Sequence, residues 1–182
     1  EALKYGHTFV DSPVSGGVEA ARNGTLSLLM GCEEAEIESI KPILRCISTN
    51  QIYLQSRGNG CVAKICNNFV LMSCMITTCE AIAASAKNGV DPALFVDVLN
   101  KCSGQSWVSS KYSPVPIHTM PNAPCRKDFD VGFQSKLALK DLNMAREIFT
   151  SSGVSSTMLN NVMEVYEKIV RDGRGTKDIG VY

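Results

Sequence analysis

The stretch RGNGCVAKICNN, residues 57–68, decides how this chain is divided. Gly58, Gly60 and Ala63 have the G-x-G-x-x-A spacing of a dinucleotide-binding turn, and the strand-like sequence QIYLQ precedes them. Glu80 follows about twenty residues later, where such a motif places an acidic residue that binds ribose. The spacing alone therefore suggests a pyrophosphate site, and the sequence that follows tests it.

That sequence argues against a dinucleotide site. The motif functions in a βαβ unit, in which the acidic residue lies at the end of a second parallel strand. Here a helical pattern begins near Gly60 and continues to Asn88, with Gly89 as its expected C-terminal residue, and no strand follows. Glu80 then lies on the helix itself. The stretch predicts the first turn of a long helix.

The predicted helix separates two parts of different character. The chain has 182 residues and 45% hydrophobic content, enough for one core and part of a second domain. Residues 1–56 have an α/β pattern, and residues 57–182 predict an all-helical domain, so the fold class is mostly α. The α/β part predicts strands at His7–Val14, Leu26–Met30 and Gln51–Gln55, and a helix at Glu34–Leu44. Beyond Asn88, the sequence predicts a helix capped by Asp91 and Pro92, a proline-rich loop, and helices at Phe133–Ser151 and Thr157–Asp172.

Composition excludes several classes of partner. Lys and Arg together number 18, as do Asp and Glu, so bulk electrostatics favours neither nucleic acid nor an anionic membrane. The eight cysteines include no C-x-x-C pair, which argues for a reducing compartment and against structural zinc; we expect no metal site. The longest uncharged stretch, Ile65–Cys79, is shorter than the roughly 20 residues of a membrane span. A buried helix explains it better.

Lys64 is the first candidate for chemistry. Gly60, Lys64 and Asn68 recur every four residues, so they share one helix face. Lys64 is the only charge between Arg57 and Glu80. An amine partly withdrawn from water can act as a general acid and base near neutral pH. Periodicity alone favours a lysine that extends from a buried helix to solvent, but the neighbouring Asn and Gly favour a site.

The sequence DSPVSGGVEAARNG, residues 11–24, contains the second candidate. A strand is expected to end at Val14, so that Ser15, Gly16 and Gly17 offer a hydroxyl and successive backbone N–H groups at the start of a short helical turn. Such an arrangement suits a carboxylate. A tight turn that needs glycine for its backbone angles explains the same residues equally well.

The sequence FQSKLALKDLNMA, residues 133–145, contains the third. Lys140 and Asp141 lie in an otherwise apolar helix, and an exposed ion pair of little energetic value is the ordinary explanation. Phe133, Lys136 and Lys140 share a face of the predicted helix, which makes a binding role possible.

Together, these motifs resemble the β-hydroxyacid dehydrogenase family in order and spacing, over essentially the whole chain. The matching motifs are DSPVSGGVEAARNGTLSLLMG, the G-x-x-x-K-x-x-x-N pattern of Gly60, Lys64 and Asn68, and FxxxLALKDLxxA. The resemblance implies that residues 1–56 end a Rossmann-type dinucleotide-binding domain whose N-terminal half precedes Glu1. It also implies that the helical domain is similar to the C-terminal domain of 6-phosphogluconate dehydrogenase.

The resemblance also implies roles for individual residues. Lys64 matches the family's catalytic lysine, which exchanges a proton with the substrate hydroxyl. Asn68 and the turn of Ser15, Gly16 and Gly17 match the groups that bind substrate. Lys140 matches a residue that contacts the cofactor NAD, with Phe133 as a weaker companion. No role is implied for Asp178 in the ending GRGTKDIGVY, and residues 103–116, which include Trp107, are where contacts specific to the acid are expected.

Within that family, the motifs AKICNN and CSGQSWVSSKYSPVP resemble the enzymes of valine catabolism. The resemblance implies NAD-dependent oxidation of 3-hydroxyisobutyrate to methylmalonate semialdehyde in the mitochondrial matrix, by a homo-oligomer (dimer or tetramer) formed through the helical domain. Without a complete nucleotide-binding half, residues 1–182 are expected to fold but to show negligible turnover. Two alternatives stay open: a related hydroxyacid dehydrogenase or short-chain semialdehyde reductase, and a non-catalytic helical oligomerisation module.

Overall fold

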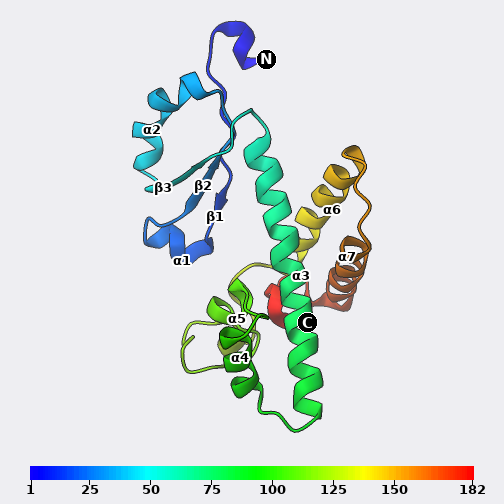
Figure 1. The fold of residues 1–182 in the computed structure, drawn as a ribbon. Helices are drawn as coiled ribbons and strands as arrows, with labels where there is room; N and C mark the ends of the chain where they lie inside the picture. Colours follow the sequence, from blue (N-terminus) through cyan, green and yellow to red (C-terminus); the bar gives the residue numbers. More distant parts are fainter. The chain divides into compact units, whose positions relative to one another are not determined.

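The computed structural model describes residues 1–182, except for the side chain of Leu3. The chain forms two compact units, Glu1–Asn67 and Asn68–Tyr182. Helix α3 (Asn59–Lys87) begins in the first unit and continues in the second (Figure 1). The expected division after residue 56 remains a prediction.

The first unit is built on a small mixed sheet. Its strands are β1 (Val14–Ser15), β2 (Ser27–Met30) and β3 (Asn50–Tyr53), in the order β1-β2-β3. β2 pairs antiparallel with β1 and parallel with β3, with Leu28 opposite Gln51. The helical segments are a 3-10 turn at Ala2–Tyr5, α1 (Gly17–Arg22), a 3-10 turn at Glu34–Glu36, and α2 (Ile37–Arg45).

The core of this unit lies on one face of β2. Because side chains alternate along a strand, Leu28 and Met30 point to the same face, and they form a buried cluster with Leu26. Ala20 of α1 and two residues of α2, Ile40 and Leu44, pack against it. Both helices therefore cover the same face of β2.

The predicted strand at His7–Val14 is wrong in extent. Only Val14 and Ser15 form a strand, and upstream of them only Asp11 pairs with Gly31 in an isolated bridge. Pro13 has no N–H group to donate to a ladder, which interrupts regular pairing between these positions. The other two strands lie within a few residues of their predicted bounds.

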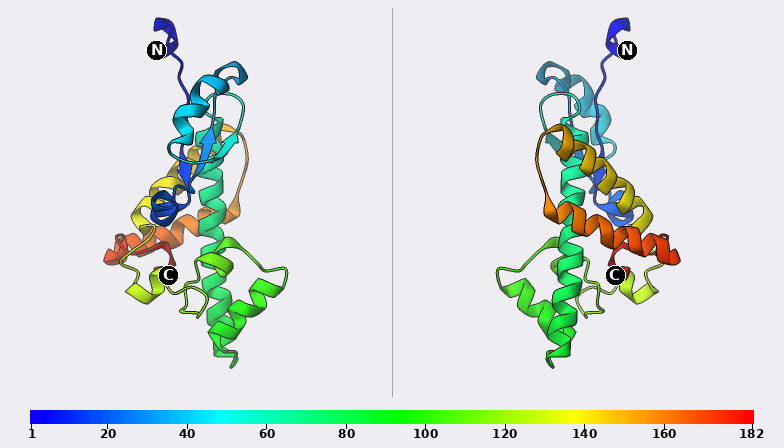
Figure 2. Two further views of the ribbon diagram at one scale, coloured as in Figure 1. Left: turned by 90° about the vertical axis from the view of Figure 1, so that its left-hand side faces the viewer. Right: turned by 90° about the vertical axis from the view of Figure 1, so that its right-hand side faces the viewer.

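The second unit is helical. Beyond α3 its elements are α4 (Pro92–Lys101), α5 (Trp107–Lys111), a 3-10 turn at Pro124–Lys127, α6 (Ser135–Ser151), α7 (Thr157–Ile169), a π-type turn at Val170–Arg174 and a 3-10 turn at Ile179–Val181. Figure 2 shows α6 and α7 side by side. The expected cap of α4 is confirmed, since the Asp91 carboxylate accepts the N–H groups of Ala93 and Leu94 at 2.9 and 3.0 Å.

Two apolar contacts connect α3 to its neighbours in this unit. Ile82 of α3 packs with Val96 of α4 and with the proline-rich segment, in a buried cluster completed by Ile117, Met120 and Ala123. The rings of Phe69 in α3 and Phe149 in α6 meet edge to face, with centroids 5.3 Å apart. Within the second unit, the start of α3 therefore packs against α6 and its end packs against α4.

Helix α6 begins at Ser135, two residues after the predicted start. Gln134 has extended backbone angles, and the N–H group of Phe133 donates to the carboxylate of Asp178. Phe133 therefore lies outside the helix and is not on the face that Lys136 and Lys140 share. The sequence did not predict the short helix α5.

Helix α3 has the length and apolar composition of a membrane-spanning helix, with a mean hydropathy of 1.6 in its most apolar window. Core helices of soluble proteins meet the same criterion. In this structure 28% of that window is fully buried, and most of its other apolar residues are partly buried. The exposed large apolar residues of α3 are Val62 and Val70.

Candidate functional site

The turn of Ser15, Gly16 and Gly17 joins the end of β1 to the start of α1. Gly16 and Gly17 have φ values of 129° and 70°, a conformation that favours glycine. Gly16 is the N-cap of α1 and has no side chain that could accept the first N–H groups of the helix. The turn thus needs its glycines for backbone reasons. Its role in substrate binding stays a prediction.

Helix α3 positions Lys64 and Asn68 one turn apart, on the same face. Gly60, one turn earlier, lies against a carboxylate and a main-chain oxygen of its own unit. A Cβ atom at Gly60 would lie 2.7 Å from a carboxylate oxygen of Asp11 and would also collide with the main-chain oxygen of Leu29. The space beside Gly60 is therefore occupied by Asp11.

Asn68 is held by a buried carboxylate. Its Nδ2 donates to Oδ2 of Asp141 at 2.7 Å, and the two residues are only 3% and 7% exposed. Because an ionised carboxylate only accepts hydrogen bonds, this contact fixes which way the amide of Asn68 is turned.

Lys140 completes this cluster. Its Nζ lies 2.9 Å from Oδ1 of Asp141, and its side chain is 56% exposed. The expected exposed ion pair is therefore half wrong, since its lysine is exposed and its carboxylate is buried against Asn68. Asp141 connects the two predicted site residues Asn68 and Lys140, and sequence reasoning missed it. Its position in an apolar helix, next to a lysine, was the available signal.

Asp178 is a second buried carboxylate that was assigned no role. It is 1% exposed and accepts hydrogen bonds from the Tyr112 hydroxyl at 2.6 Å, the Phe133 N–H at 2.7 Å and the Gly180 N–H at 2.9 Å. Burial raises the pKa of Asp178 despite these bonds. Burial, together with the nearby charge of Asp178, also raises the pKa of Tyr112.

The hydrogen bond between Tyr112 and Asp178 joins segments that are distant in the sequence. The ring of Trp107 stacks on Tyr112 with centroids 4.8 Å apart. The segment expected to supply acid-specific contacts, residues 103–116, is therefore held to the C-terminal turn through Tyr112. The same carboxylate holds the predicted cofactor residue Phe133 by its main chain. Asp178 thus has a structural role in the second unit.

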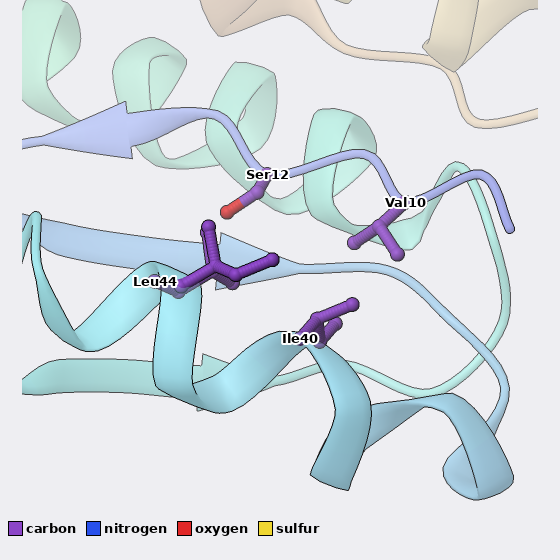
Figure 3. Close-up of a pocket in the computed structure, with 5 residues that line it drawn as sticks. Val10, Ser12, Ile40 and Leu44 are labelled. Carbon is purple, nitrogen blue, oxygen red and sulfur yellow. The ribbon is translucent and has the colours of Figure 1, made fainter.

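A shallow apolar pocket lies between α2 and the segment before β1 (Figure 3). It has a volume of about 150 Å³ and is lined by Val10, Ser12, Ile40, Ile43 and Leu44. The Oγ atom of Ser12 is buried without a hydrogen-bond partner. No ionisable side chain is among these lining residues, so the pocket offers no acid or base for catalysis.

The described side chains include no group of three His, Cys, Asp or Glu residues placed to bind a metal ion. All eight cysteines are unpaired.

Two family models together match nearly the whole chain. Residues 58–180 match the model described as the NAD-binding domain of NADP-dependent 3-hydroxyisobutyrate dehydrogenase. Residues 1–62 match the NAD-binding domain of 6-phosphogluconate dehydrogenase. The two matches overlap at the start of α3.

Individual relatives agree with these matches. The chain is 40% identical to a probable mitochondrial 3-hydroxyisobutyrate dehydrogenase of Arabidopsis thaliana, over 93% of this chain and 48% of that protein. It is 33% identical to an NAD-dependent L-serine dehydrogenase of Pseudomonas aeruginosa, over 99% of this chain and 60% of that protein. The chain thus spans about half the length of the curated relatives it matches.

A solved structure shows the same fold. The 3-hydroxyisobutyrate dehydrogenase of Mycobacterium tuberculosis, determined with L-serine, superposes with a TM-score of 0.87 at 30% identity, over 94% of this chain and 58% of that one. Together with the family model that matches residues 58–180, this likeness shows that the chain belongs to the 3-hydroxyisobutyrate dehydrogenase family.

Proposed function

We propose that this chain supplies the substrate-binding and catalytic part of an NAD-dependent dehydrogenase that oxidises 3-hydroxyisobutyrate to methylmalonate semialdehyde, a step of valine catabolism. The observation that carries the proposal is the face of α3 on which Lys64 stands one turn before a buried Asn68. A carboxylate holds that amide in one orientation. A lysine that merely reaches solvent needs no such neighbour.

The proposed chemistry needs a base, a carboxylate-binding group and a hydride acceptor. Lys64, as a neutral amine, accepts the proton of the substrate hydroxyl while the adjacent C–H bond breaks and its electron pair leaves with the hydrogen as hydride. Asn68 orients the hydroxyl, and the N–H groups of the Ser15–Gly17 turn bind the carboxylate. In the reverse direction Lys64 returns the proton.

NAD, when bound, supplies the nicotinamide ring that accepts the hydride. The exposed ammonium of Lys140 has the charge to bind a phosphate of such a cofactor, and its contact with Asp141 holds it near the start of α6. Phe133 is the weaker candidate, since its main chain is engaged by Asp178.

The names of the relatives favour L-serine as a second candidate substrate. Both molecules carry a carboxylate and a hydroxyl on the carbon two positions away, and they differ in a methyl or an ammonium group on the carbon between. Measuring kcat/KM for both acids with the complete protein separates the candidates. A higher value for L-serine would contradict the proposed substrate while leaving the reaction class unchanged.

We also propose a mitochondrial location for the parent protein, because the curated 3-hydroxyisobutyrate dehydrogenases of plants and animals that it matches are named mitochondrial. Cell fractionation tests this. Recovery of the complete protein in the cytosol alone would contradict it.

Truncating Asp141 is expected to lower stability and activity together. In Asp141→Ala, the buried amide of Asn68 loses its hydrogen bond to the carboxylate, and a hydrogen bond to a charged group contributes about 1.5–3 kcal/mol. The free energy of unfolding should fall by that amount in urea titrations, and kcat should fall because Asn68 can turn away. Unchanged stability and kcat would contradict the role of Asp141.

Lys140→Ala serves as the matched comparison. It removes the exposed partner of the same carboxylate, and exposed ion pairs contribute only about 0–1 kcal/mol. Stability should therefore change little, whereas the Kd for NAD, measured by fluorescence titration of the complete protein, should rise. A Kd equal to that of the wild type would remove Lys140 from the cofactor site.

We propose that the helical unit forms a homo-oligomer. Leu94 and Val98 are exposed at adjacent turns of α4, and burial in an interface would remove their apolar surface from water. Light scattering should show a dimer or tetramer, and Leu94→Glu with Val98→Glu should dissociate it. The control is Val154→Glu, because Val154 is also an exposed apolar residue and lies between α6 and α7. A monomeric wild type would contradict the proposal.

A further inference from the structure

Asp11 caps helix α3 from a distant part of the sequence. Its Oδ1 accepts the N–H of Gly58 at 2.6 Å, and its Oδ2 accepts the N–H of Cys61 at 2.9 Å. The first N–H groups of a helix have no partner within the helix. A carboxylate there also interacts favourably with the helix dipole. Asp11 thus satisfies two main-chain groups at the start of the helix that carries Lys64.

Two glycines make room for this carboxylate. A Cβ atom at Gly31 would lie 2.9 Å from Oδ2 of Asp11 and would collide with its Oδ1. A Cβ atom at Gly60 would lie 2.7 Å from the same Oδ2. The carboxylate therefore lies against the main chains after β2 and at the start of α3. A longer side chain at position 11 would not fit this slot without moving one of them.

The main chain of Asp11 is also fixed. Its N–H donates to the oxygen of Gly31 at 3.2 Å, and the N–H of Gly31 donates to the oxygen of Asp11 at 2.8 Å. Four residues later the chain reaches Ser15, the start of the glycine turn. A single residue therefore attaches the segment before the Ser15–Gly17 turn by its main chain and the first turn of α3 by its side chain.

We propose that Asp11 is a positioning residue, which sets Lys64 relative to the Ser15–Gly17 turn by holding the first turn of α3. This inference rests on the proposed role of Lys64. Lys64 follows Cys61 by three residues, about 4.5 Å along the helix axis, so a shift of the first turn is transmitted to it directly. Displacing a catalytic group by about 1 Å can cost about a hundredfold in rate.

The carboxylate is charged at neutral pH. Burial raises the pKa of Asp11, but the hydrogen bonds from the N–H groups of Gly58 and Cys61 lower it by more. The pKa of Asp11 therefore lies below the ordinary value. The stability that the cap contributes is therefore fully present above the ordinary pKa of an aspartate and is lost as the pH falls through the lower value of the folded protein.

The test compares Asp11→Asn with Asp91→Asn in the complete protein. Asp91 also caps a helix through two N–H groups, although its Oδ1 accepts both, so each variant removes a negative charge from the start of a helix. Asp11→Asn should lower kcat by about 10-fold to 100-fold, with a smaller change in KM. Asp91→Asn should leave kcat unchanged even where the melting temperature falls equally. Equal kcat values for the two variants would overturn the proposal.

The same substitution in a Lys64→Ala background separates positioning from stability. If Asp11 acts through Lys64, Asp11→Asn should add little to the loss caused by Lys64→Ala; an undiminished further loss means that it acts otherwise and overturns the inference. Retention of activity by Lys64→Ala alone would instead overturn the proposed function. Should Asp11→Asn not fold, Asp11→Glu keeps the charge in a side chain too long for the slot, and the same drop in kcat is expected of it.

Discussion

Lys64→Ala should lower kcat of the complete protein at least about a hundredfold, because general acid and base groups contribute about 10²–10⁴ in rate. The proton of the substrate hydroxyl would then have no acceptor as the hydride leaves. Steady-state kinetics with 3-hydroxyisobutyrate and NAD measure the loss. The matched control is Lys87→Ala, an exposed lysine at the end of the same helix, which should leave kcat unchanged.

Lys64→Arg distinguishes the catalytic role from the structural alternative. An arginine keeps the positive charge and the long aliphatic stem, so it would replace a lysine that only extends to solvent. A guanidinium stays protonated and cannot accept the hydroxyl proton. We therefore expect Lys64→Arg to be as inactive as Lys64→Ala. Activity within tenfold of the wild type in either variant would exclude Lys64 as the acid and base.

Asp178→Ala should cause the largest loss of stability, about 3–5 kcal/mol. The substitution removes the acceptor of three donors, which are the Tyr112 hydroxyl and the N–H groups of Phe133 and Gly180. The Phe133 N–H also donates to the Tyr112 oxygen at 3.2 Å, so the other two donors are the ones left unpaired. Each unpaired buried donor costs about 1–3 kcal/mol. Urea unfolding of the 182-residue chain can be followed by the fluorescence of Trp107, its only tryptophan, which stacks on Tyr112.

Asp172→Ala is the control for this measurement. Asp172 is a partly exposed residue near the end of the same chain, at 3.8 Å from Arg174, and its loss should change stability by less than about 1 kcal/mol. Equal unfolding midpoints for the two variants would show that the contacts of Asp178 do not hold the second unit together.

The pH dependence of Asp178 has a definite sign. Because burial raises its pKa in the folded protein, the folded state binds more protons than the unfolded state between the ordinary and the raised values. Its contribution to stability is thus fully present below the ordinary pKa and declines as the pH rises through the raised one. Asp178→Asn should lack this dependence, and a difference from the wild type that is constant with pH would contradict the raised pKa.

The sequence by itself determined the features that depend on neighbouring residues. The apolar periodicity and Gly89 give the extent of α3, and Asp91 followed by Pro92 gives the start of α4, because helix signals act within a few residues of the chain. The same locality places Lys64 and Asn68 on one helix face. It also removes the dinucleotide interpretation of Gly58 and Gly60, since the helix continues where a strand would be required.

Only the tertiary structure decided which distant groups surround those residues. Asp11 meets the start of α3, Asp141 is buried against Asn68, and Asp178 holds both Tyr112 and Phe133. Each contact joins residues at least 45 positions apart in the sequence, so neither periodicity nor a local capping signal reports it. All three are carboxylates that, in sequence, look like ordinary surface charges. Packing makes Asp141 and Asp178 buried acceptors and Asp11 a partly buried one, because the amide, hydroxyl and N–H groups that need them come from other segments.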